Sequence, residues 1–120
     1  MATQTTLELN LNVTASATWT QVKNQAAGSA YTVGASKRAD IRNITISNLG
    51  ANSSVIDLAI STDSTVTDDE KLLAPLTLAA GYTTTIDQLC TLPATFGLWL
   101  RATGTSPNVT LSAVALEVTP

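Results

Sequence analysis

Residues 41–61, IRNITISNLGANSSVIDLAIS, decide the fold class of this chain. Isoleucine or asparagine stands at every second position over 44–48, and isoleucine or leucine does so again over 56–60, with mostly polar residues between. Alternation with a period of two is typical of β-strands that bury one face. Residues 49–54 between the two runs are rich in turn formers. We therefore expect the two runs to pair antiparallel as a hairpin.

The same alternation extends toward both ends of the chain. The run LELNLNV at 7–13 places four apolar side chains on one face: Leu7, Leu9, Leu11 and Val13. A short strand over 76–78 and a Thr-rich strand over 82–86 flank a turn, which predicts a second hairpin. In the last strand the apolar positions change parity after Leu111, so we expect a β-bulge near Ala113 that returns Val114 and the residues after it to the core.

These segments give seven to nine short strands and at most one short helical turn, which is capped by Thr67 and Glu70 and extends through Leu73. The pattern predicts an all-β protein, an antiparallel β-sandwich of the jelly-roll or Greek-key type. A closed barrel is the alternative. We expect one domain over residues 1–120, in which residues 1–6 could extend as an arm and add a strand to a neighbouring molecule.

Composition narrows the classes of partner. The chain has 120 residues, of which 12% are charged, and a net charge of −3. This balance offers no clustered cations for nucleic acid or for an anionic membrane surface, so we expect binding to neither. The first residues lack the pattern of an export signal, and Cys90 is the only cysteine. We therefore expect assembly in a reducing cytoplasm, without disulfides.

The chain contains no histidine, the commonest general base near neutral pH and a frequent zinc ligand. We expect no enzyme activity and no cofactor. The acidic loop, with Asp63, Asp68, Asp69 and Glu70, is the one place where a catalytic carboxylate pair or a calcium ion could be held. A solvated loop is the simpler interpretation, because neither an EF-hand spacing nor an aromatic-lined cleft accompanies these residues.

Trp99 and Arg101 are candidates for an interface. Their neighbours Phe96, Leu98 and Leu100 take the core positions of the strand, so Trp99 is expected to point outward beside Arg101. Tryptophan and arginine are enriched where proteins bind one another, which favours a contact between subunits. Burial of Trp99 under a loop is the alternative. Thr3 and Thr5 in the N-terminal arm are further interface candidates.

Three stretches resemble small β-sandwich proteins of tailed-bacteriophage virions: 41–61, LLAPLTLAAGYTTTID at 72–87, and LWLRATGTSPNVTLSAVALEVT at 98–119. In that group a strand with I-x-N precedes an Asn/Ser turn and an apolar strand. The motif L-x-L-A-A-G-x-T and a closing strand after R-A follow. The resemblance covers about two-thirds of the chain by eye, transfers no functional residue, and leaves residues 1–39 unmatched.

The resemblance implies a capsid decoration (cement) protein that binds the major capsid protein on the outside of the virion, commonly as a homotrimer. A fibre or receptor-binding module of the same particle and a carbohydrate-binding module are the alternatives. The residues agree with this class, because a sandwich without catalytic groups acts through its surface and shape.

Overall fold

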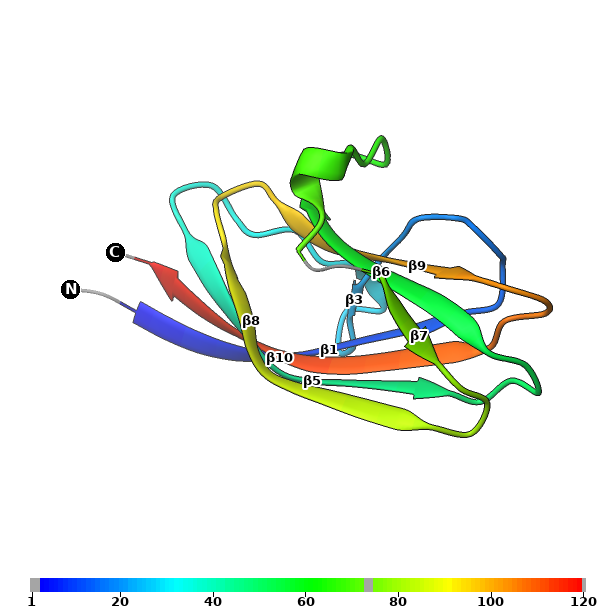
Figure 1. The fold of residues 1–120 in the computed structure, drawn as a ribbon. Helices are drawn as coiled ribbons and strands as arrows, with labels where there is room; N and C mark the ends of the chain where they lie inside the picture. Colours follow the sequence, from blue (N-terminus) through cyan, green and yellow to red (C-terminus); the bar gives the residue numbers. More distant parts are fainter. Residues whose placement is uncertain (1–2, 73–74, 120) are drawn as a thin grey trace.

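The computed structural model describes residues 3–72 and 75–119. Ten strands lie within these residues: β1 Thr3–Val13, β2 Thr20–Gln21, β3 Lys23–Asn24, β4 Ser29–Ala30, β5 Arg38–Asn48, β6 Ser54–Ser61, β7 Leu76–Leu78, β8 Thr83–Leu92, β9 Gly97–Thr103 and β10 Val109–Thr119. They form a six-stranded sheet in the order β4-β3-β1-β10-β5-β8 and a four-stranded sheet in the order β2-β9-β6-β7. The two antiparallel sheets form the layers of a sandwich (Figure 1).

The main strand pairs are nested within one another. β1 pairs with β10, β2 with β9, β5 with β8, and β6 with β7, which is the order of a jelly roll. The prediction of an all-β sandwich is therefore confirmed, in its jelly-roll form and not as a closed barrel. The helical part of the described chain is a three-residue 3₁₀ turn, η1 Asp68–Glu70. No helix within it is long and apolar enough to cross a membrane.

The core lies between the two sheets and contains most of the side chains that the alternation assigned to it. Leu9, Leu11 and Val13 of β1 are buried, as are Ile44 and Ile46 of β5. From the four-stranded sheet come Ile56, Leu58, Leu98 and Leu100, each at most 1% exposed. Burial of these side chains, at roughly 25 cal/mol for each square ångström removed from water, supplies the main stabilisation of the sandwich.

The predicted hairpins are wrong. β5 belongs to the six-stranded sheet and β6 to the four-stranded sheet, so residues 49–53 cross from one sheet to the other. The turn between β7 and β8 crosses in the same way (Figure 1). Alternation shows which side chains of a strand face the core, but a strand in the opposite sheet satisfies the same pattern. Stacked sheets lie about 10 Å apart, which five residues easily span.

A bulge does lie near Ala113, but it does not change the parity of β10. The register between β10 and β5 shifts between Ser112 and Val114, and the extra residue is on β5, where Asn43 has a φ of 53°. Ala113 and Ala115 are buried, so Val114 and its alternate neighbours face outward. The expectation that Val114 returns to the core is wrong, because two small alanines fill the inward positions.

Candidate interaction surfaces

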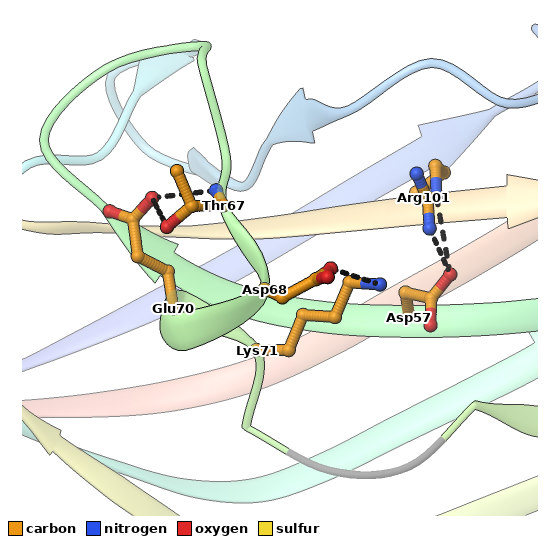
Figure 2. Close-up of polar contacts among 6 residues, drawn as sticks. All are labelled: Asp57, Thr67, Asp68, Glu70, Lys71 and Arg101. Carbon is orange, nitrogen blue, oxygen red and sulfur yellow. Dashed lines mark hydrogen bonds and ion pairs between the residues drawn. The ribbon is translucent and has the colours of Figure 1, made fainter.

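A cluster of aromatic and charged side chains covers the outer face of the four-stranded sheet. Asp57 of β6 pairs with Arg101 of β9 in the strand register. The guanidinium donates hydrogen bonds from Nε at 3.2 Å and from Nη2 at 2.8 Å, both to Oδ2 of Asp57 (Figure 2). The same guanidinium lies over the ring of Trp19, 4.7 Å from its centroid, within the range of a cation–π contact.

The ion pair is unevenly buried. The side chain of Asp57 is 4% exposed and that of Arg101 is 27% exposed. Oδ1 of Asp57 is buried without a hydrogen-bond partner among the described residues. A buried carboxylate of this kind depends on its cation, because an ion that is removed from water loses its hydration. The arrangement joins the two central strands of this sheet and leaves one carboxylate oxygen unused.

Trp99 points away from the core, as predicted, but it is only 8% exposed. Its indole N–H donates to the carbonyl of Ser61 at 3.3 Å. Of the two alternatives for this residue, burial within the chain is therefore the one found, and little of its ring remains for a subunit contact. Arg101 retains more exposed surface beside it, so of the two it is the one able to contact a partner.

The carboxylates of the acidic loop are directed to separate partners. Glu70 accepts hydrogen bonds from the backbone N–H of Thr67 at 2.8 Å and from its hydroxyl at 3.1 Å (Figure 2). The backbone bond is the main reason that the pKa of Glu70 is lowered. Asp68 pairs with Lys71 at 3.2 Å, and Asp63 accepts the N–H of Thr65.

Within the described residues, no three Asp, Glu or Cys side chains lie close enough together to hold a metal ion. Asp63, Asp68 and Glu70 are instead held by contacts within the loop, and the calcium hypothesis for these three residues and Asp69 gains no support. The capping interaction predicted for Thr67 and Glu70 is present, although η1 ends at Glu70. Leu73, to which the helical turn was expected to extend, lies outside the described residues.

The N-terminal segment is a strand paired on one side. Thr3 is in register with Thr119, and the pairing continues without a shift to Val13. Thr3 and Thr5 are exposed, on the side of the sheet that faces the core farther along β1. Residues 3–6 are therefore part of the six-stranded sheet. They are not an arm free of the body.

The other edge of this segment is open. The carbonyl of Glu8 accepts a hydrogen bond from the N–H of Gln25 at 2.9 Å, on the side away from β10. Because backbone groups alternate along a strand, the N–H and C=O groups of Gln4 and Thr6 point to that same side. β3 pairs with β1 only at Leu9 and Asn10, so no described strand occupies the edge beside residues 3–7.

A polar triad stabilises the terminal end of the sandwich. Tyr31 donates its hydroxyl to Oε2 of Glu117 at 2.7 Å, and Lys37 donates to Oε1 at 3.2 Å. Burial, followed by the hydrogen bond to Glu117, raises the pKa of Tyr31. No spacing in the sequence indicates this triad, because Glu117 is far in the chain from both of its partners. Glu117 is the one charged residue of β10, which is the one signal that could have indicated it.

A shallow groove of about 400 Å³ crosses the outer face of the six-stranded sheet. Amide and hydroxyl side chains line it, mainly from three neighbouring strands: Asn10, Asn12, Thr45, Ser47, Thr110 and Ser112. The lining includes no charged or aromatic residue. The groove can therefore exchange hydrogen bonds with a neutral polar group, but it offers no ring on which a sugar could stack. No local pattern in the sequence indicates this groove, because strand order alone brings these residues together.

No protein-family model and no curated protein matches the chain. Solved structures do share its fold. One is a chain of Bacillus endospore appendages, which form a novel family of disulfide-linked pili. It is 15% identical, with a TM-score of 0.52, and the match covers 99% of this chain and 89% of that one.

A second structure that shares the fold is a chain of infectious bursal disease virus, Gx strain. It is 10% identical, with a TM-score of 0.54, and the match covers 98% of this chain but 33% of the viral one. The chain thus spans about a third of the length of that viral chain. At these identities the likeness establishes a β-sandwich of the kind found in viral and appendage proteins. The finer resemblance to phage virion proteins is not established by it.

Proposed function

We propose that this protein is a structural subunit of a large particle, and specifically a decoration protein that binds the outer surface of a phage capsid and stabilises it. The observation that carries the proposal is the open edge of β1 beside residues 3–7, where β3 no longer pairs with it. An unpaired edge is a ready site for adding a strand, and natural proteins usually block such edges. The virion exterior is the proposed location, and the major capsid protein the proposed partner.

The contact would use the backbone. The N–H and C=O groups of Gln4 and Thr6 are free to pair with an extended segment of a neighbouring subunit, and main-chain hydrogen bonds of this kind give affinity with little dependence on sequence. Thr3 and Thr5 would flank that contact. This retains the expected role of the N-terminal segment, with the segment acting as a sheet edge in place of a free arm.

Stabilisation would come from several weak contacts acting together. A ring of protomers, with three as the proposed number, would lie across neighbouring capsid subunits. Each linked contact then raises the effective concentration of the next. Separating the capsid subunits would also require breaking the decoration contacts. No catalytic group or cofactor is needed for this role.

The proposal is tested by mixing the purified protein with capsids that lack it, pelleting them and measuring the bound fraction, with light scattering to give the mass of the free protein. Thr6→Pro removes the N–H at the open edge and adds a ring that blocks strand pairing, yet proline is tolerated at edges. Thr6→Ala is the matched control. We expect Thr6→Pro to lower capsid affinity at least tenfold and Thr6→Ala to leave it unchanged.

Two outcomes count against the proposal. A monomer that ignores capsids would exclude the decoration role. Equal capsid binding by Thr6→Pro and Thr6→Ala would exclude the β1 edge as the contact.

A fibre or appendage module is the second candidate, and the shape of the molecule favours it. The principal extents are 49 × 25 × 24 Å, and the fold covers 89% of a pilus-forming appendage chain. This role predicts filaments or long oligomers in electron micrographs of concentrated protein. A carbohydrate-binding role would use the neutral groove, and binding to a glycan array that Asn10→Ala abolishes would support it.

A further inference from the structure

Three apolar side chains lie on the outer face of the six-stranded sheet. Val114, Leu116 and Val118 alternate with inward-facing residues of β10 and are each half-buried. The core positions beside them are taken by Ala113 and Ala115. We call these three residues the β10 stripe. An apolar row at the centre of a sheet face adds nothing to the core of its own chain and is a common feature of interfaces.

The residues beside the stripe form three rows across β1, β10 and β5. The strand registers place Glu8, Val114 and Arg42 in the first row, Thr6, Leu116 and Asp40 in the second, and Gln4, Val118 and Arg38 in the third. The flanking side chains are exposed, except that Asp40 is half-buried. The β1 side of the stripe thus carries a carboxylate, a hydroxyl and an amide. The β5 side carries two guanidiniums with a carboxylate between them.

We propose that this face binds a second copy of the chain, through a two-fold axis that lies along the β10 stripe. Rotation about that axis places each stripe residue against the same residue of the other copy. It also places the β1 side of one copy against the β5 side of the other. Each Glu8 then faces the Arg42 of the other copy. Thr6 faces Asp40, and Gln4 faces Arg38. All three juxtapositions join a hydrogen-bond donor to an acceptor, and the first joins opposite charges.

The charges select this orientation over its alternative. A two-fold axis that crosses the strands at Leu116 would place Val114 against Val118 and Arg42 against Arg38. Like charges facing one another disfavour a complex. With the axis along β10, the ends of the two sandwiches that carry the chain termini lie side by side. Both Glu8–Arg42 pairs then form at once.

The patch is small. It contains nine residues per copy, whereas a standard interface uses roughly 20–30 residues on each side. We therefore expect a weak dimer that forms at micromolar or higher concentration. It does not rest on the proposed function, because the contact uses the face of the sheet and the capsid contact uses the backbone edge of β1.

Charge reversal with mixing tests the pairing. Glu8→Arg and Arg42→Glu each place like charges on both sides of the stripe. Each variant alone should therefore form this dimer at least tenfold more weakly than the parent chain in sedimentation equilibrium. An equal mixture restores both pairs as a heterodimer of twice 12.4 kDa. Asp69→Arg makes the same change of charge as Glu8→Arg, but in the acidic loop, and should leave the dimer intact. Circular dichroism and the urea midpoint verify that each variant is folded.

Cross-linking tests the axis. In a Cys90→Ser background, a short bis-maleimide should link Val114→Cys of one copy to Val114→Cys of the other. It should likewise link Val118→Cys to Val118→Cys. A parent chain that stays monomeric at high concentration, or a mixture that does not recover the dimer, would overturn the proposal. Linking of Val114→Cys only to Val118→Cys would overturn the axis. Capsid binding is measured separately, so loss of the dimer and loss of the decoration role are distinguishable.

Discussion

Replacement of Arg101 by methionine should cost far more stability than replacement of its partner Asp57 by alanine. The two residues share one ion pair, but the side chain of Asp57 is 4% exposed and that of Arg101 is 27% exposed. Without Arg101, the carboxylate is buried with both oxygens unpaired, which costs about 3–5 kcal/mol. Without Asp57, the guanidinium keeps its contact with Trp19 and its access to water, so we expect a loss of about 1 kcal/mol.

Urea unfolding of the two single variants and of the double variant measures this difference. The double variant Asp57→Ala/Arg101→Met should be more stable than Arg101→Met alone, since it removes the stranded carboxylate. Arg101→Lys keeps the charge and should fall between the parent and Arg101→Met. Equal costs for the two single variants, or a double variant at least as unstable as Arg101→Met, would show that the carboxylate is hydrated and refute the reasoning.

Three further predictions concern the fold. Gly104→Ala should destabilise the protein by about 2 kcal/mol in thermal unfolding, because the residue has a φ of +155° and a Cβ would lie 2.8 Å from the carbonyl of Ser53; an unchanged melting temperature would contradict it. Asn48→Ala should cost about 3 kcal/mol in urea, because its buried amide makes three hydrogen bonds to backbone groups, two in the loop after β5 and one to Leu78 of β7; Ser47→Ala is the control, and equal costs would argue against this role. Burial raises the pKa of Cys90 from 9.0 to about 11 and also raises that of Tyr31. The unfolded chain therefore loses these protons at a lower pH than the folded chain does. The free energy of unfolding keeps its full contribution from these groups below about pH 9 and falls as the pH rises. Cys90→Ser should reduce the loss between pH 9 and 11, and an equal loss without the thiol would exclude its part.

Local patterns predicted the faces of strands well and their partners poorly. The alternation over 7–13 assigned Leu9, Leu11 and Val13 to the core correctly, because each side chain has only two faces to choose between. The same alternation could not tell that residues 49–53 cross between sheets. In β10 it failed in another way, since apolar Val114 was assigned to the core although Ala115 occupies the inward position.

The candidate surfaces were predictable only where a local signal existed. The Thr67–Glu70 capping interaction was found from its spacing, and the outward direction of Trp99 from its strand neighbours. The exposure of Trp99 could not be predicted, since it depends on residues that pack over the sheet. Tyr31 and Glu117 are separated by most of the chain, so no spacing indicates their hydrogen bond.

The alternation in the sequence is enough to specify an all-β chain, because a period of two in apolar side chains is satisfied by strands and not by helices. The sequence also determined the absence of histidine and the low charge, which are properties of composition. The tertiary structure alone decided which strands are neighbours, and hence the open edge of β1, the polar groove and the rows beside the β10 stripe. These surfaces are made of residues from strands far apart in sequence, and only the nested pairing of the jelly roll brings them together.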